Sequence, residues 1–367
     1  MKKKKVLHIF GIMNRGGAEL RTLSTVPEMT SRKVTYDYLV LSGQKGVLDD
    51  SIKASGSVIH YCKLGPMFLS KYVKILRHND YDVVHSHVSL VSGLMLLIAW
   101  MCGIKVRIAH FRSTHDVETP SIFRRLRDHI LRFLLRRFAT SIVGVSKATL
   151  DAFWHREWPH NTKFKVIYNG FPHVKFSQTP DFWQSVCAKP CHGPRILHVA
   201  RMHEQKNQIF LMRVFCEYLK QASHATLVMV GKEDPAIKRE LLHTIAEFGA
   251  EENVIFTGEQ AEVLPFMLHA DLMLFPSKWE GLPGAVMESA RVGLRVLGSK
   301  IPPIEEVSEK LPCVQALPLE KTPKEWADQI TRVLAEKPQT NTYRQAFIES
   351  EFQLENNVKQ LFTLYAQ

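Results

Sequence analysis

The stretch VLHIFGIMNRGGAEL (residues 6–20) combines an apolar run, a turn with two adjacent glycines and a helix-forming segment. This order is typical of a βα unit, the building block of nucleotide-binding domains. The glycines lack the G-x-G-x-x-G spacing of a dinucleotide site, and Ala18 and Glu19 stand where a P-loop has Lys and Ser or Thr. Gly16 and Gly17 still leave bare N–H groups at a helix start, which an anion can approach closely. The turn therefore indicates either an anion site or a plain connection.

The strand–helix alternation that begins here continues along the chain. Seven apolar runs precede residue 172 and six follow residue 194, and the segment between them contains four prolines. Near-continuous apolar runs of this kind are typical of parallel strands covered on both faces. The runs are residues 6–10, 36–42, 57–62, 81–87, 105–111, 141–146 and 165–170, then 195–200, 226–231, 253–258, 272–277, 294–299 and 313–318. The sequence predicts an α/β protein with two tandem parallel-sheet domains.

A chain of 367 residues exceeds what one ordinary core accommodates. We expect a first domain over 1–172, a linker over 173–194, a second domain over 195–341 and a C-terminal helix over 342–367. The six scattered cysteines favour a reducing cytosol. The N-terminal lysines precede a short strand-like run with no cleavage site, and the longest apolar run, residues 90–104, is shorter than the ~20 residues that span a bilayer. Any membrane contact is therefore expected to be peripheral.

Charge is unevenly distributed. Residues 1–172 contain 27 Lys and Arg against 12 Asp and Glu, whereas residues 173–367 contain 21 against 24. Residues 122–138 place six arginines among apolar side chains, a pattern typical of helices that lie on anionic bilayers or that pack on their own sheet. We expect the membrane contact. No recognition motif for nucleic acid accompanies this charge. The six are Arg124, Arg125, Arg127, Arg132, Arg136 and Arg137.

Two loops of the second half carry candidate ligand-binding residues. In RMHEQKN (residues 201–207), Arg201 follows a strand directly and Lys206 precedes the next helix, so two cations face the edge where such sheets bind ligands and suit a diphosphate. In PSKWEGLPGAVMESARVG (residues 276–293), Glu280 lies in a Gly- and Pro-rich turn and Glu288 in the helix that follows. A helix start attracts anions, and carboxylates accept hydrogen bonds from vicinal hydroxyls. These residues together indicate a sugar on each side of a phosphate.

The chain resembles the retaining family 4 glycosyltransferases of the GT-B fold, particularly those that build capsular, exo- and lipopolysaccharides. The E-x7-E pair of Glu280 and Glu288 is the most specific feature, followed by Arg201 with Lys206 and by GGAE. The other matching motifs are YDVVHSH (81–87), KVRIAH (105–110), VSKA (145–148), VIYNG (166–170), VGKED (230–234) and VIFTG (254–258). The resemblance covers nearly the whole chain. It implies two Rossmann-like domains that face a central cleft, with the C-terminal helix crossing back to the first domain.

The resemblance also implies the residues that act. The first domain would bind the acceptor and the second the nucleotide sugar. Arg201 and Lys206 would neutralise the diphosphate, Glu288 would hold the ribose and Glu280 would contact the donor sugar. His110 would be the active-site histidine, which touches the donor sugar or the acceptor, and Phe111 and Arg112 depart from the small polar residue and second histidine common in relatives. The remaining substrate-binding residues so implied are Gly16, Gly17, Asn207, Gly231, Gly281, Leu282, Pro283, Gly284 and Ala285.

The function implied is a metal-independent, retaining glycosyltransferase of the hexosyltransferase type. It would use a nucleotide-diphosphate sugar, UDP-linked in preference to GDP-linked, to extend a lipid-linked glycan at the inner membrane face, with no further cofactor. A nucleotide-sugar epimerase of the same fold and a non-catalytic sugar-nucleotide-binding scaffold are the alternatives. His85 and His87 alternate at a strand end, where they favour acceptor contacts or simple strand-end polarity over metal ligation.

Overall fold

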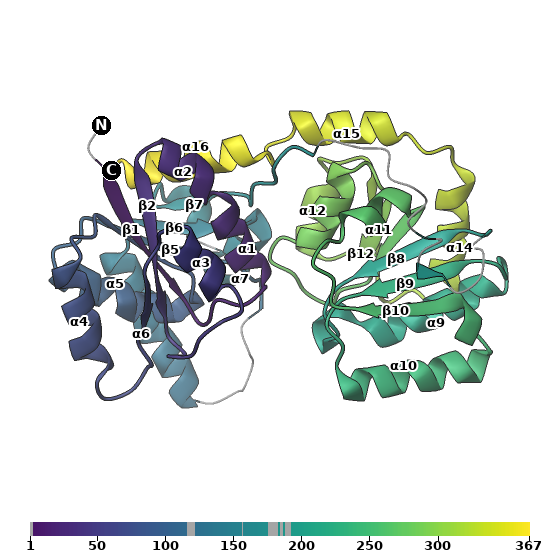
Figure 1. Ribbon diagram of the computed structural model, residues 1–367, viewed down its shortest axis with the longest axis horizontal. Coiled ribbons are helices and arrows are strands. Elements are labelled where there is room, and N and C mark those ends of the chain that lie inside the picture. The colour runs from purple at the N-terminus through teal and green to yellow at the C-terminus, as the bar shows by residue number, and fades with distance from the viewer. Residues whose placement is uncertain (1–2, 116–121, 156, 175–182, 184–185, 188–191) are drawn as a thin grey trace. The chain divides into compact units, whose positions relative to one another are not determined.

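The computed structural model describes residues 3–115, 122–155, 157–174, 183, 186–187 and 192–367. The chain divides into two compact units (Figure 1). Unit 1 contains residues 1–172 and 351–367, and unit 2 contains residues 173–350. Each unit is built on one parallel sheet, and all thirteen predicted strands are present. The predicted α/β class with two parallel-sheet domains is therefore confirmed.

The sheet of unit 1 has seven strands in the order β3-β2-β1-β4-β5-β6-β7. Neighbouring strands pair in parallel, with His8 of β1 opposite His85 of β4. The strand order reverses between β1 and β4, which makes their carboxyl ends the switch point where such sheets bind ligands. The strands are β1 (Lys4–Phe10), β2 (Val34–Val40), β3 (Ile59–Tyr61), β4 (Val83–Ser86), β5 (Val106–Phe111), β6 (Ser141–Gly144) and β7 (Phe164–Val166).

Helices cover both faces of this sheet, which explains its continuous apolar runs. One face packs against α4 (Phe68–His78), α5 (Ser92–Met101), α6 (Ile122–Phe138) and α7 (Lys147–Trp154). The other face packs against α1 (Gly17–Ser24), α2 (Val26–Ser31), α3 (Asp49–Ala54) and α16 (Leu354–Tyr365). Because side chains alternate along a strand, His8, His85 and His110 all belong to this second face.

The sheet of unit 2 has six parallel strands in the order β10-β9-β8-β11-β12-β13. Its order reverses between β8 and β11. The strands are β8 (Arg195–Val199), β9 (Thr226–Val230), β10 (Val254–Gly258), β11 (Leu272–Phe275), β12 (Val296–Ser299) and β13 (Val314–Leu317). One face packs against α9 (Gln208–Leu219), α10 (Pro235–Phe248) and α14 (Pro323–Ala335). Helices α11 (Leu264–His269), α12 (Gly284–Arg291) and α13 (Pro302–Ser308) contact the strands as well.

The C-terminal segment forms two helices where the sequence predicted one. Helix α15 (Thr340–Glu349) belongs to unit 2, where it packs on α12 and Arg344 Nε donates to the Val292 carbonyl at 2.8 Å. Only α16 belongs to unit 1, and Tyr365 at its end is fully buried against the sheet. The two helices separate at residues 350–353 (SEFQ), and no Gly or Pro within residues 342–367 marks this division in the sequence. Most of the predicted linker lies outside the described residues, but Trp183 within it is buried and donates its indole N–H to the Phe266 carbonyl at 3.3 Å.

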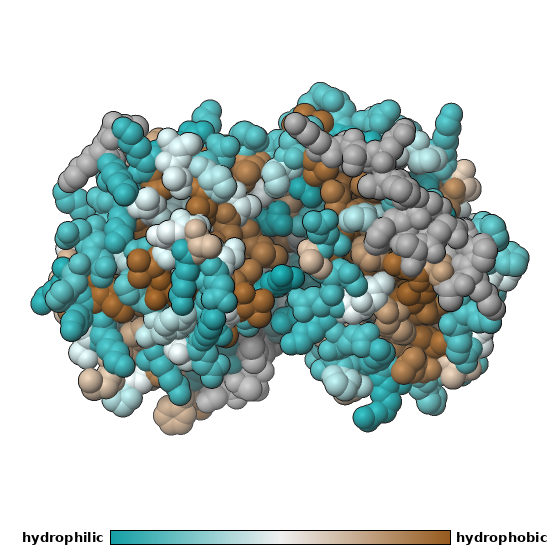
Figure 2. Space-filling model, viewed as in Figure 1, coloured by the Kyte–Doolittle hydropathy of each residue, from teal (hydrophilic) through white to brown (hydrophobic). Residues whose placement is uncertain are grey.

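Hydrophilic side chains cover most of the face seen in Figure 2, and hydrophobic ones form separate patches within each unit. In the described part of the chain, no helix combines the length and the apolar character needed to cross a membrane.

Candidate active site

The loops that follow β8 and β11 lie at the switch point of unit 2. The loop after β8 begins at Ala200 and includes the short 3-10 helix η3 (Glu204–Lys206), and the loop after β11 comprises residues 276–283. Ligands of open parallel sheets bind where the strand order reverses, outside the carboxyl ends of the strands. Arg201, Lys206 and Glu280, which the sequence singled out from separate motifs, therefore share one edge of one sheet.

The Lys206 ammonium and the Glu280 carboxylate form an ion pair at this edge. Their Nζ and Oε1 atoms are 2.5 Å apart, and the two side chains are only 16% and 8% exposed. Lys206 Nζ also lies 5.1 Å from the centre of the Phe275 ring, at the end of β11. A lysine ammonium has three N–H donors, so the pair leaves capacity for a second acceptor. The sequence did not predict that these two residues bind each other.

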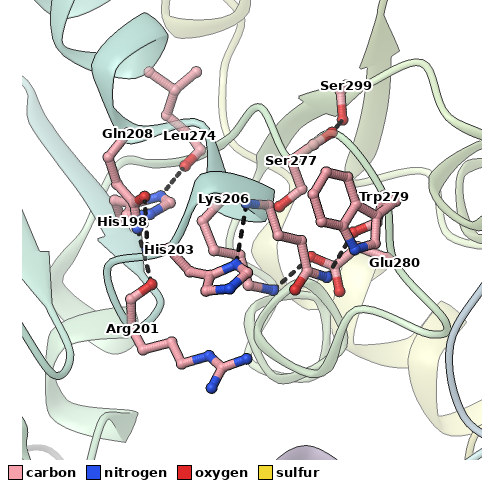
Figure 3. A network of polar contacts seen from close by, with 11 residues as sticks. His198, Arg201, His203, Lys206, Gln208, Leu274, Ser277, Trp279, Glu280 and Ser299 are labelled. Atoms are coloured by element: carbon pink, nitrogen blue, oxygen red, sulfur yellow. Dashed lines mark hydrogen bonds and ion pairs between the residues drawn. The ribbon is translucent and has the colours of Figure 1, made fainter. Parts of the chain in front are cut away.

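Arg201 differs from Lys206 in its surroundings. Its backbone is held, because the carbonyl accepts a hydrogen bond from Gln208 Nε2 at 3.0 Å. Its side chain is exposed, and its guanidinium contacts none of the other residues drawn in Figure 3. Among the described residues no carboxylate pairs with it. Arg201 therefore presents a planar cation on a fixed backbone, the arrangement that suits bidentate binding of a phosphate.

Further hydrogen bonds join the two loops. Gln205 donates through Nε2 to the Trp279 carbonyl at 2.7 Å and accepts through its own carbonyl from Lys278 N–H at 2.8 Å. An exposed ion pair between Lys278 and Glu204, at 3.1 Å, adds a fourth connection. These four connections hold the two loops together and restrict the distance between Lys206 and Glu280. Sequence analysis missed Gln205, because a glutamine in a charged loop carries no signal for a partner 74 residues away.

The start of α12 offers backbone donors beside this pair. Met287 N–H makes the first bond of the helix, to the Pro283 carbonyl at 3.1 Å, so the N–H groups of Gly284 and Ala285 precede it and face outward from the helix end. Gly281, Leu282 and Pro283 are buried and anchor the turn. Glu288 is half-buried in the second turn of α12. The helix dipole favours an anion at Gly284 and Ala285.

The backbone conformation by itself explains the residue type at two of the predicted binding positions, Asn207 and Gly231. Asn207 adopts a left-handed conformation, with φ of 56°, where the chain turns from η3 into α9. Gly231 has φ of 145°, and a Cβ there would lie 2.1 Å from the Ala200 carbonyl oxygen. A side chain at Gly231 would therefore force apart the ends of β8 and β9. Both residues shape the edge of the site whether or not a ligand touches them.

The predicted glycine pair lies at the start of α1 in unit 1. Gly16 N–H is not bare, because it donates to the Asn14 carbonyl at 2.8 Å in a tight turn. Leu20 N–H makes the first helical bond, to the Gly16 carbonyl at 3.0 Å, so Gly17 N–H is the glycine donor outside the helical bonding. A Cβ on Gly17 would meet no atom within 4 Å. The Gly16 amide is therefore not the bare donor that the sequence predicted, and anion binding at Gly17 stays a prediction.

His110 is 1% exposed and lies in a cluster of buried histidines. Its Nδ1 is 3.1 Å from His85 Nε2, and His85 Nδ1 is 2.8 Å from the hydroxyl of Tyr365 on α16. Beside them His8 Nδ1 is 3.0 Å from His87 Nε2. The register of β1, β4 and β5 brings these side chains together, which a single motif in the sequence does not show.

Arg112 completes this cluster. Its Nε–H donates to His87 Nδ1 at 3.2 Å and its Nη1 donates to the Asn169 side-chain oxygen at 2.5 Å. Burial lowers the pKa of Arg112 to about 10. Burial, followed by the Arg112 charge, lowers the pKa of His8 to about 3, and burial is also the main reason why the pKa values of His85, His87 and His110 lie well below their usual value. The histidines are therefore neutral near pH 7.

Ligand nitrogens of His8, His85 and His87 lie within 4.8 Å of one another, a spacing compatible with a metal ion. Hydrogen-bond direction argues against that use. Arginine only donates, so His87 Nδ1 is the acceptor and the proton of the neutral ring is on Nε2, facing His8. A metal ion would have to displace this proton beside an arginine charge. The arrangement favours the polar-contact interpretation of His85 and His87.

Comparison with known proteins identifies the class of protein that this fold and these loops define. A model described as "Glycosyltransferase Family 4" matches residues 15–174, and one described as "Glycosyl transferases group 1" matches residues 193–336. The chain belongs to the family 4 glycosyltransferases, and it has the GT-B fold.

The chain is 32% identical to the capsular polysaccharide biosynthesis glycosyltransferase CapH of Staphylococcus aureus. The match extends over 338 residues and covers 91% of each chain. It is 25% identical to the putative glycosyltransferase EpsF of Bacillus subtilis, over 99% of this chain and 96% of that one. Among solved structures, Anabaena HepE in complex with UDP and glucose superposes with a TM-score of 0.79 at 19% identity, covering 99% and 100% of the two chains. The family prediction is confirmed, and the comparisons give no support to the epimerase alternative.

Proposed function

We propose that this glycosyltransferase is retaining and metal-independent, and that it moves a hexosyl group from a nucleotide-diphosphate sugar to a glycan acceptor. The observation that carries the proposal is the edge of unit 2, where Arg201, the Lys206–Glu280 pair and the start of α12 converge. Two cations and a helix N-terminus supply the positive charge that a divalent ion would otherwise provide to a diphosphate.

Each residue has a role in this proposal. Arg201 and Lys206 bind the diphosphate, assisted by the amides of Gly284 and Ala285. Glu280 holds Lys206 in place and contacts the donor sugar, and Glu288 accepts hydrogen bonds from the ribose. Gly281, Leu282 and Pro283 set the turn, and Asn207 and Gly231 shape the site's backbone. In unit 1, Gly17 N–H offers a donor to an anion and His110 contacts a sugar hydroxyl.

The reaction balances without an enzymic nucleophile. The bond between the anomeric carbon and the phosphate oxygen breaks, and its electron pair goes to the diphosphate. The acceptor oxygen attacks the same face of the sugar, and its proton passes to the departing phosphate oxygen. Positive charge fixed at the diphosphate stabilises the leaving group in the transition state. Retention follows from attack on the face that the leaving group vacates.

The donor is a UDP-sugar and the product belongs to a surface polysaccharide. Support comes from the solved structure of HepE with UDP-glucose and from the name of CapH, which assigns that protein to capsular polysaccharide biosynthesis. The test is a thermal-shift screen of UDP-, GDP- and ADP-sugars, followed by turnover with the best binder in the presence of EDTA. An α-linked product from an α-linked donor supports the proposal, whereas an inverted linkage or loss of turnover in EDTA would overturn the mechanism.

Helix α6 associates peripherally with the anionic inner face of the membrane. The structure alters the basis for this part of the proposal, because four of the six arginines already have partners within unit 1. Arg124 and Arg127 pair with Asp128, Arg136 pairs with Glu157, and Arg132 donates to the Phe153 carbonyl. The other two arginines, Arg125 and Arg137, are exposed, and α6 also presents an exposed apolar row. The row consists of Ile122, Phe123, Leu126, Ile130 and Phe133, which are 83%, 85%, 59%, 49% and 58% exposed.

A row of this kind inserts into the headgroup boundary while arginines contact anionic lipid. Replacement of Ile122, Phe123 and Leu126 by Ser should abolish co-sedimentation with phosphatidylglycerol vesicles. Leu242→Ser, at an exposed apolar position of α10, is the matched control. Equal binding of wild type and the α6 variant would contradict the membrane role and leave the transferase proposal untouched. A lipid-linked acceptor would then reach the enzyme without any contact between α6 and the membrane.

A further inference from the structure

A small polar cavity lies within unit 1, between the sheet and helices α1 and α16. Ten residues line it, and none of them is Asp or Glu. We propose that this cavity binds one monatomic anion of the size of chloride, held by the His8 Nε2–H group and the Arg112 guanidinium. Anion binding there does not depend on the proposed function, because every lining residue belongs to unit 1.

Hydrogen-bond direction fixes the ring proton of His8. Arginine only donates, so His87 Nδ1, which lies 3.2 Å from Arg112 Nε, is an acceptor. Neutral His87 therefore carries its proton on Nε2 and donates it to His8 Nδ1 at 3.0 Å. Because His8 Nδ1 accepts and a neutral imidazole keeps one ring proton, the proton of His8 is on Nε2. Both contacts have the length of ordinary hydrogen bonds.

The His8 Nε2–H group has no hydrogen-bond partner in the described chain, although the side chain is only 1% exposed. The centre of the Tyr36 ring lies 4.2 Å from that of His8, but an aromatic ring is only a weak acceptor. Buried N–H groups are nearly always paired, because their desolvation otherwise goes uncompensated. His8 lines the cavity, so an acceptor bound within it would satisfy this donor.

The Arg112 guanidinium supplies a second donor to the same cavity. Its Nη2 lies 3.4 Å from Thr22 Oγ1, which is longer than the usual N–H···O bond. Its Nη1 donates to the Asn169 side-chain oxygen, and its Nε donates to His87. All of these partners are uncharged, and no carboxylate forms an ion pair with Arg112 within the part of the chain that the structure describes. The Nη2 group is therefore available for a stronger acceptor.

Charge favours an anion over a water molecule as the occupant. Burial lowers the pKa of Arg112 to about 10, and nearby acidic groups, Tyr365 first and then Glu19, offset only part of this effect. Arg21, whose guanidinium lies 4.5 Å from the centre of the Phe171 ring, adds a second cation to the lining. Charges removed from water are normally compensated by an opposite charge. A water molecule would leave the Arg112 charge uncompensated, whereas an anion would neutralise it.

The size of the cavity limits the anion to a single atom. Its volume is about 10 Å³, which is room for one water-sized group. Phosphate and carboxylate groups contain several heavy atoms and do not fit, whereas a chloride ion is little larger than a water molecule. A bound chloride would connect Thr22 of α1 with His8 of β1 and with Arg112, which follows β5. Binding should therefore stabilise the packing of α1 on the sheet.

Hydrogen exchange of β1 in increasing sodium chloride measures the effect of binding on unit 1. Sodium gluconate, whose anion is too large for the cavity, keeps the ionic strength constant. A ligand that binds only the folded state raises protection by the factor 1 + [ligand]/Kd, so protection of β1 should rise at least about 5-fold between about 5 and about 200 mM chloride. Strand β9 of unit 2 is the internal control, and its protection should not change.

Substitutions test whether the cavity causes the response. Arg112→Gln removes the charge and should abolish the chloride-dependent rise in protection. Arg107→Gln is the matched control and should keep the wild-type response, because Arg107 is a half-buried arginine of β5 that does not line the cavity and donates to the Phe138 carbonyl at 2.7 Å. If Arg112→Gln does not fold, His8→Phe removes the unpaired N–H but keeps an aromatic ring, and it should reduce the response as well.

Anomalous diffraction from crystals soaked in sodium bromide locates the ion. A bromide peak within hydrogen-bonding distance of His8 Nε2 and Arg112 is the expected result, and a water molecule in that place would overturn the proposal. A bromide peak without a chloride-dependent rise in protection would show an adventitious ion only. Equal chloride responses in wild type and Arg112→Gln would exclude the cavity as their cause. These outcomes leave the transferase proposal untouched, because no nucleotide sugar is used.

Discussion

Replacement of Glu280 by Gln should destabilise unit 2, because it leaves the Lys206 ammonium without its counter-charge. The carboxylate is 8% exposed and the ammonium side chain 16%, with 2.5 Å between Nζ and Oε1. Breaking a fully buried ion pair costs about 3–5 kcal/mol, and the residual exposure of both side chains reduces this to about 2–3 kcal/mol. The Lys206→Met variant should lose a similar amount for the same reason.

A double-mutant cycle measures the interaction energy between Lys206 and Glu280. The Glu280→Gln, Lys206→Met double variant contains no uncompensated charge, so its loss of stability should be smaller than the sum of the single losses by at least about 1 kcal/mol. Urea unfolding monitored by hydrogen exchange of β8 and β11 measures the stability of unit 2 separately. The control cycle uses Lys278→Met and Glu204→Gln, because this pair joins the same two loops but is 40% and 76% exposed.

The control pair should show a coupling below about 0.5 kcal/mol, as exposed ion pairs do. Equal coupling in the two cycles would refute the reasoning, because burial would then contribute nothing to the Lys206–Glu280 pair. Additive losses at Lys206 and Glu280 would refute it more directly, since they would show that the two charges do not stabilise each other.

Two further predictions concern backbone and pH. Gly231→Ala should destabilise unit 2 by more than about 2 kcal/mol, because a Cβ would lie 2.1 Å from the Ala200 carbonyl oxygen and φ is 145°. Gly284→Ala is the control, because a Cβ there meets no atom within 4 Å, and it should change the stability to urea little. Equal losses of stability in the two variants would contradict this explanation. Unit 1 should lose stability as pH falls from about 6.5 towards 3, because the unfolded chain binds protons that buried His8, with its pKa lowered to about 3, does not. Hydrogen exchange of β1 across this range measures the loss, and His8→Gln should make the slope shallower, whereas an unchanged slope would exclude His8 as its cause.

The sequence allowed the strands and the site loops to be predicted because both are local patterns. Each apolar run forms a strand within its own few residues. Arg201 and Glu280 lie in the loops that follow two of these strands, whose shared edge the parallel topology determines. The Lys206–Glu280 pair and the bonds of Gln205 join residues 74 positions apart, so no local pattern could show which groups bind each other.

Local sequence patterns could not predict the histidine cluster either. His8, His85 and His110 come together through strand register, and Tyr365 reaches His85 from 280 residues away on α16. Residues 342–367 were predicted as one helix because their apolar periodicity does not reveal which unit each turn packs against. Helix α6 illustrates the same limit: its pattern showed an amphipathic helix, but not that the apolar row stays exposed while most of its arginines have partners.

The proposed function requires that the edge of unit 2 binds a nucleotide diphosphate through Arg201 and Lys206. Calorimetric titration of UDP into wild type and Arg201→Ala tests it directly, with Arg239→Ala as the control for loss of an exposed arginine on α10. A charge-assisted hydrogen bond contributes about 1.5–3 kcal/mol, so Arg201→Ala should raise Kd by about 10- to 100-fold, while Arg239→Ala leaves it unchanged. UDP binding that is equal in wild type and Arg201→Ala would contradict the central claim.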